Sequence, residues 1–161
     1  MSRWVFMMAL LVLAPGTNAN AARTLLADLM ARAPADTGAQ AMSALRLEAC
    51  LRRARELDST GIAIDYEIAA IDREVAEGIF LQNQLNAELP ALGDYDEKAL
   101  EDFQRRVVRH DELAKKFRTE FPLYQKKQRA YEAAVTEFEQ DCAGRFHRSD
   151  LEAIKSKLDL K

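Results

Sequence analysis

Apolar residues recur every three or four positions along two long stretches of the chain, Leu47 to Leu92 and Leu100 to Cys142. The alternation of 3 and 4 never slips in either stretch, and this 3.5-residue period is typical of the contact seam of a coiled coil. We therefore expect two long helices that pack as the arms of one antiparallel hairpin. The seam residues of the first arm are Leu47, Cys50, Ala54, Leu57, Gly61, Ile64, Ile68, Ile71, Val75, Gly78, Gln82, Leu85, Leu89 and Leu92, and those of the second arm are Leu100, Phe103, Val107, His110, Ala114, Phe117, Phe121, Tyr124, Gln128, Tyr131, Val135, Phe138 and Cys142.

The two seams align when the two cysteines are placed opposite each other. The residue numbers of every facing pair then add up to 192, and from Cys50 onward each seam residue of the first arm meets a seam residue of the second. Small residues tend to face large ones, as at Gly61 and Tyr131, which suits interdigitating side chains. The polar residues Gln82 and His110 also face each other, and we expect them to form a buried polar layer with a shared hydrogen bond. A second register, with pairs adding up to 185, aligns the seams but separates the cysteines, so the first is preferred.

Cap and turn residues indicate where the arms begin and end. The first arm is expected at about residues 38–90, opened by a capping box at 37–40, and the second at about 95–143, opened by a box that starts at Asp94. Pro122 should kink the second arm. The segment Asp58-Ser59-Thr60-Gly61 resembles a helix stop, but the seam period runs through it and predicts at most a weakened turn.

Short amphipathic helices are expected on either side of the hairpin, at about residues 22–33 and 150–158. Ser149-Asp150-Leu151-Glu152 has the form of a cap for the second of them. We expect both to pack together at the base, beyond the cysteines. The predicted fold class is all-α: a long antiparallel two-helix coiled-coil hairpin with short terminal helices at its base.

Residues 1–21 have the pattern of an export signal. Arg3 provides a positive start, an apolar run of 11 residues extends from Trp4 to Ala14, and Ala19-Asn20-Ala21 offers a small-x-small cleavage site. The apolar run is shorter than the roughly 20 residues that span a bilayer. We therefore expect a cleaved signal peptide, a single mature domain at residues 22–161, a bacterial periplasmic location and no stable membrane span after cleavage.

Charge and cysteine content narrow the range of partners. Without residues 1–21, the chain has 140 residues with 22 basic and 26 acidic side chains, a net charge of −4. This balance gives no reason to expect nucleic acid as a partner. Two cysteines in an exported chain predict a disulfide between Cys50 and Cys142, whose loop of about 90 residues is worth roughly 4–5 kcal/mol at most.

No motif in the sequence indicates catalysis or a cofactor. His110 is explained as a seam residue, and His147 lies in a connector without further metal ligands nearby in sequence. The cysteines lack the spacing of a redox pair, which favours a structural bridge. Nucleophile elbows, phosphate loops and dinucleotide fingerprints are all absent. We therefore expect a protein that is not an enzyme and that binds neither metal nor cofactor.

Two surfaces are candidates for protein interaction. The first is a second apolar line on the first arm, formed by Ile62, Tyr66, Ala69, Ala76 and Phe80. It is either a widened edge of the core or a docking surface for a second hairpin or a client protein. The second surface is the tip, which is acidic at Glu88, Asp94, Asp96 and Glu97.

The end of the second arm, from Tyr131 through Cys142-Ala143-Gly144-Arg145, resembles a group of small exported bacterial coiled-coil hairpin proteins. In that group an aromatic-spaced helix ends in a Cys-Ala-Gly-Arg-like segment and a short acidic-leucine helix follows, here Asp150-Leu151-Glu152-Ala153-Ile154. The resemblance covers about the last 60 residues together with Cys50. It implies a secreted helical hairpin, and because no activity is established for the group, it transfers no functional residues.

These observations favour a non-enzymatic periplasmic scaffold or protein-interaction module, with a protein partner or self-association. The alternative is a holdase-type chaperone with oligomeric coiled-coil arms, with hinges at Gly61 and Pro122. An enzyme is a third hypothesis, which would need a pocket at the base that combines His147 with carboxylates.

Overall fold

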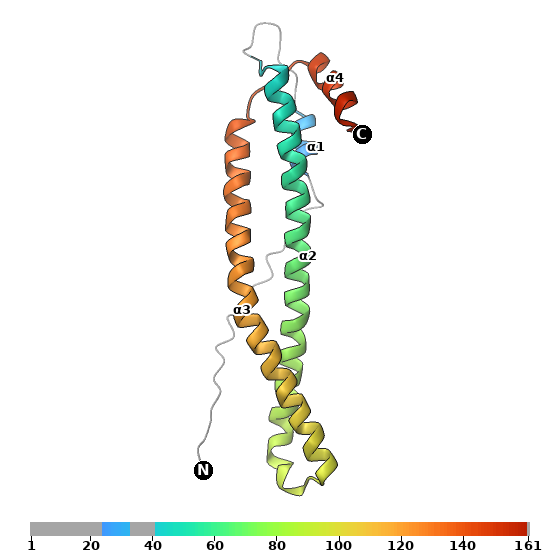
Figure 1. Ribbon diagram of the computed structural model, residues 1–161, viewed down its shortest axis with the longest axis vertical. Helices are drawn as coiled ribbons and strands as arrows, with labels where there is room; N and C mark the ends of the chain where they lie inside the picture. The colour runs from blue at the N-terminus through green and yellow to red at the C-terminus, as the bar shows by residue number, and fades with distance from the viewer. Residues whose placement is uncertain (1–23, 33–40, 161) are drawn as a thin grey trace.

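The computed structural model describes residues 24–32 and 41–160 (Figure 1). These residues form helices and connecting segments without any strand, so the predicted all-α hairpin is confirmed. The predicted export signal at 1–21 and the capping box at 37–40 lie outside the described residues. The elements are α1 (Leu25–Met30), α2 (Ala44–Glu88), the 3₁₀ helix η1 (Leu89–Asp94), α3 (Glu97–Asp141) and α4 (Arg148–Leu158).

Helices α2 and α3 are the two arms, each 45 residues long, and they run antiparallel beside each other (Figure 1). Side-chain caps begin both. The Ser43 hydroxyl accepts a hydrogen bond from the Arg46 N–H at 3.3 Å, and the Asp96 carboxylate accepts one from the Ala99 N–H at 2.8 Å. The first arm thus starts at Ala44 rather than near residue 38, and the second is capped two residues after the expected Asp94.

The register in which facing numbers add up to 192 is confirmed in the half of the hairpin nearer the base. Cys50 and Cys142 form a disulfide, with their Cα atoms 5.9 Å apart. Further along the arms, a Cβ atom built on Gly61 would lie 2.7 Å from the Tyr131 hydroxyl oxygen, so this pair faces as expected. An ion pair beside the seam fits the same register. Lys127 and Glu67 lie 2.6 Å apart, and each of them is one residue before a seam position.

The largest core lies at the base, where α1 and α4 pack against α2 on the side away from α3 (Figure 1). The two short helices therefore share one core with the arms, and α2 is the element that both of them contact. Five side chains of this base core are almost completely buried: Phe138, Phe146, Leu29, Leu47 and Leu51. By contrast, most seam residues in the middle of the arms are only half-buried, because two helices cannot enclose a seam on all sides.

The predicted weak turn at 58–61 is a continuous part of α2. The Ser59 and Thr60 hydroxyls donate to carbonyls one turn earlier, at 2.9 Å each, within the regular helix. The Asp58 carboxylate instead points outward and accepts the first two N–H groups of α1, from Leu25 at 2.8 Å and Leu26 at 3.1 Å. Asp58 therefore caps a neighbouring helix, which explains why a helix-stop residue type lies in the middle of α2.

Two arginines satisfy the carbonyl groups at the end of α3, which the helix itself leaves without partners. Arg32 donates to the Cys142 carbonyl, and Arg46 donates to the Asp141 carbonyl at 2.6 Å. The Met42 N–H donates a hydrogen bond of 2.7 Å to the Arg145 carbonyl, which joins the segment before α2 to the segment after α3. The hairpin base is thus closed by hydrogen bonds as well as by the disulfide.

Two further expectations concern the second half of the chain. Pro122 lies inside α3, and Figure 1 shows the helix changing direction in its middle part, where its colour passes from orange to gold. The last helix begins at Arg148, with His147 at its N-cap, instead of being capped by Ser149. None of the helices in the described residues is long and apolar enough to span a membrane.

Candidate interaction surface

The outer face of α2 carries the largest set of exposed apolar side chains on the arms. Ile62, Tyr66 and Phe80 are 54%, 73% and 60% exposed. The residues between them on the same face are also exposed, and the spacing is 4, 3, 4, 3 and 4. We call this set the outer seam; its members are Ile62, Tyr66, Ala69, Arg73, Ala76 and Phe80.

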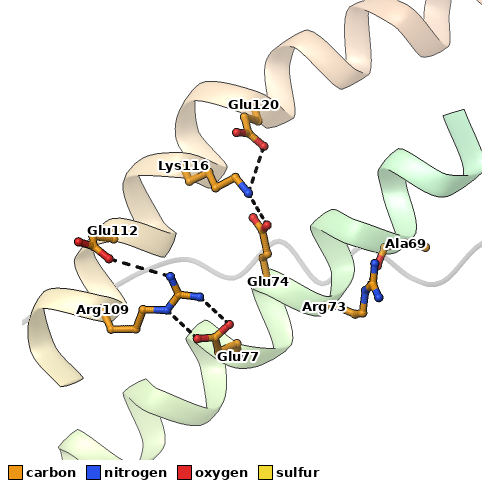
Figure 2. A network of polar contacts seen from close by, with 8 residues as sticks. All are labelled: Ala69, Arg73, Glu74, Glu77, Arg109, Glu112, Lys116 and Glu120. Atoms are coloured by element: carbon orange, nitrogen blue, oxygen red, sulfur yellow. Dashed lines mark hydrogen bonds and ion pairs between the residues drawn. The ribbon is translucent and has the colours of Figure 1, made fainter. Parts of the chain in front are cut away.

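The outer seam faces away from α3. Figure 2 shows Arg73 on the side of α2 that is turned from α3, with its Nε donating to the Ala69 carbonyl at 3.2 Å. Of the two interpretations of this apolar line, the structure excludes the widened core edge. Its members follow the inner-seam positions by one or two residues, and because each residue turns an α-helix by about 100°, the line lies on the opposite side of α2.

On the inner side, ion pairs join α2 to α3 in the same region (Figure 2). Arg109 donates from two nitrogens to the Glu77 carboxylate, at 2.7 and 3.0 Å, and Lys116 donates to Glu74. These bonds lower the pKa of Glu77 and raise the pKa of Lys116, because each ion is hydrogen-bonded to its opposite charge. Charges on this side of α2 are thus already paired within the hairpin.

The charges around the outer seam differ in this respect. Asp65, Asp72 and Arg73 are all exposed, and none of them forms an ion pair with another described residue. The outer seam therefore carries one cation without an ion-pair partner among the described residues, Arg73. Two carboxylates that likewise form no ion pair with a described residue lie along its edge nearer α3, where the charges of Asp65 and Asp72 also raise the pKa of Tyr124. Such a combination is typical of a surface that binds protein.

The predicted buried polar layer is not present. Gln82 and His110 are half-buried, no hydrogen bond joins them, and no polar side chain in the described part of the chain is fully buried. His110 instead has its Nδ1 3.4 Å from an oxygen of neighbouring Asp111. Leu81 and Leu113 are buried at this height, at 9% and 6% exposed. The two arms cross towards the tip (Figure 1). Because of this crossing, residues whose numbers add up to 192 no longer face each other directly in that part of the hairpin.

The tip is acidic, as expected, but its carboxylates do different things. Asp94, Asp96 and Glu97 are exposed, and Asp96 is engaged as the α3 cap. Glu88 accepts two hydrogen bonds of 2.5 Å from the Arg106 guanidinium and one of 3.1 Å from the Tyr95 hydroxyl. The Arg106 bonds hold the pKa of Glu88 below its ordinary value of 4.5. Glu88 thus fixes the turn, and the other three face solvent.

A shallow groove at the base was not predicted. It lies between the outer face of α2 and the end of α4, and it is lined by Leu51, Arg52, Arg55, Glu56, Ser59, Thr60, Leu158 and Leu160. Positions 55, 59, 62 and 66 are spaced by four, three and four residues, so the groove continues directly into the outer seam. The sequence contains no sign of the groove because the docking position of α4 creates it.

The described residues contain no group of three or more His, Cys, Asp or Glu side chains that could hold a metal ion. His147 is exposed at the start of α4, and both cysteines are in the disulfide. Comparison of the chain with protein-family models, with curated proteins and with solved structures finds no match.

Proposed function

We propose that this chain is an exported, non-enzymatic helical hairpin that acts as a protein-interaction module in the bacterial periplasm. The observation that carries the proposal is the outer seam, where three large apolar side chains are more than half exposed on a rigid helix. Exposing such a line costs hydration free energy of roughly 25 cal/mol per Å², which a bound protein surface recovers. The free acidic residues of the tip, Asp94 and Glu97, provide a second contact region.

The long arms and the base suit this role. The disulfide, the Asp58 cap and the two arginines that bind the α3 terminus hold the base together, so α2 is presented as a straight and stable platform. Export is supported by the pattern of residues 1–21. A mass measurement on the protein recovered from the periplasmic fraction tests this part: a chain that starts at Ala22 supports it, and a full-length chain in the cytoplasm contradicts it.

Photo-crosslinking in living cells tests the interaction. A benzoyl-phenylalanine is placed at Tyr66, at Phe80 or at Glu97, and in a matched control at the exposed Glu139 on α3. The proposal expects discrete adducts of constant mass from positions 66 or 80 that the control does not give. If positions 66, 80 and 97 give no adduct above the control, the proposal is wrong.

A holdase-type chaperone is the second candidate, and the exposure of Tyr66 and Phe80 favours it. A holdase of this kind would form oligomers and slow the aggregation of an unfolding client at stoichiometric amounts. Replacing both aromatic residues with serine should then abolish protection. A chain that leaves client aggregation unchanged excludes this candidate.

A further inference from the structure

The outer seam has the spacing of a coiled-coil seam but is covered by no helix among the described residues. At the base, α1 lies on α2 only as far as Asp58, where its first N–H groups are bound. Beyond that point the alternation of 4 and 3 continues for six positions, all of them exposed. A seam of this kind is completed by a second helix. The proposed function assigns this surface to a protein partner, and the inference that follows rests on it and concerns the identity of that partner.

The outer seam is complementary to itself when two copies run antiparallel. If facing residue numbers add up to 142, Ile62 meets Phe80 of the second copy, Tyr66 meets Ala76, and Ala69 meets Arg73. Every member is then paired, and each of the two longest side chains, Tyr66 and Arg73, faces an alanine. A parallel pairing would instead place Tyr66 on Tyr66 and Arg73 on Arg73, which combines steric crowding with like-charge repulsion.

The unpaired charges fit the same arrangement. Ala69 of the second copy leaves room for the Arg73 side chain, and the residues flanking that alanine on one side are Asp65 and Asp72. Each arginine therefore lies beside two carboxylates of the other copy. The two Asp72 carboxylates approach near the two-fold axis, with the two Arg73 guanidiniums adjacent to them, so that positive and negative charges alternate across the interface.

The ends of the interface match as well. The two-fold axis of the dimer passes beside position 71. The base groove is lined by residues 51–60 of α2, which lie roughly 17–30 Å along the helix from this axis at 1.5 Å per residue. Residues 82–91 of the second copy lie at the same distance on the other side. The tip of one copy therefore lies at the same height as the groove of the other, which is lined by Leu158, Arg52 and Arg55.

We propose that the partner of the outer seam is a second copy of this chain, and that the mature protein is a two-fold symmetric antiparallel dimer. The α2 helices form the centre of the dimer, and each tip lies beside the base of the other copy. Such an isologous arrangement is closed, so it stops at two copies.

Thiol crosslinking in the mature, disulfide-intact protein tests the geometry. The native cysteines are bonded to each other, so a short bismaleimide reacts only with introduced thiols. A mixture of Ile62→Cys chains and Phe80→Cys chains should crosslink to a heterodimer. Ile62→Cys chains alone should not, because their two thiols would be about 27 Å apart. Self-crosslinking of Ile62→Cys, or no crosslinking of the mixture, overturns the proposal.

Sedimentation velocity measures the strength of the association. Arg73→Glu should raise the dimer Kd at least about tenfold because it places like charges together. Exchanging all three charges, as Asp65→Arg, Asp72→Arg and Arg73→Asp, should restore most of the affinity. The matched control is Arg129→Glu, an exposed arginine on α3 without an ion pair to any described residue, and it should leave the Kd unchanged.

A monomeric mass at about 200 µM overturns the proposed dimer, as does a Kd that Arg73→Glu and Arg129→Glu change equally. Photo-crosslinking in cells tests the proposed function separately from the dimer. If the chain is monomeric but the crosslinker at position 66 captures a different protein in cells, self-association is wrong and the interaction module stands. If positions 66, 80 and 97 all capture nothing above the control, both proposals are wrong.

Discussion

Breaking the bond between Cys50 and Cys142 should lower the free energy of unfolding by up to about 4–5 kcal/mol. The cysteines are 92 residues apart, and closing a loop of that size in the unfolded chain corresponds to about 4.6 kcal/mol at 25 °C in the chain-entropy model. The loss is large for this fold because most of the mid-arm seam is only half-buried, whereas a typical domain has just 5–15 kcal/mol in total. The bond also lies in the base core, where both cysteines are at most 4% exposed.

Urea unfolding followed by circular dichroism measures this loss. Three samples of the mature protein are compared: oxidised, reduced, and the double variant Cys50→Ala/Cys142→Ala. The reduced protein keeps both sulfur atoms and loses only the link, so it isolates the chain-entropy effect. The double variant should lose roughly 1–2 kcal/mol more, because two buried side chains are shortened. A loss below about 1 kcal/mol on reduction would refute the reasoning, and it would mean that the rest of the base already holds the arms together.

Three further predictions follow from individual contacts. Gly78→Ala should stabilise the chain by about 1 kcal/mol in the same urea assay, because nothing lies within 4 Å of the added Cβ. Gly61→Ala should stabilise the chain less or destabilise it, since its Cβ meets the Tyr131 hydroxyl. Equal stabilisation by the two variants would contradict the contact between Gly61 and Tyr131. The pKa of Glu88 is lower in the folded state than in the unfolded chain. The contribution of Glu88 to stability should therefore be complete above about pH 4.5 and vanish as the pH falls through the lowered pKa. The stability difference between wild type and Glu88→Gln, measured from about pH 2 to 7, should shrink only at the acid end. Asp58→Ala should cost about 1–2 kcal/mol and speed amide hydrogen exchange in α1 but not in α4, and unchanged exchange in α1 would exclude the capping role.

The candidate surface was visible in the sequence, but its meaning was not. The spacing of Ile62, Tyr66 and Phe80 marks an apolar line, yet a widened core edge and a docking face predict the same residues. Only the position of α3 excludes the first of these, because Arg73 of this line points away from α3 (Figure 2) and the three apolar residues are more than half exposed. The base groove could not be predicted, since Leu158 reaches Leu51 only through the docking of α4.

The sequence by itself determined the two arms, their register and their covalent link, because a 3.5-residue apolar period and a pair of facing cysteines are encoded locally along each helix. It misplaced the polar layer, because facing positions depend on how two arms cross, and crossing is a property of the pair. The tertiary structure alone decided that Asp58 caps α1 and that Arg32 and Arg46 bind the end of α3. These are contacts between segments distant in sequence, and a linear period carries no record of them.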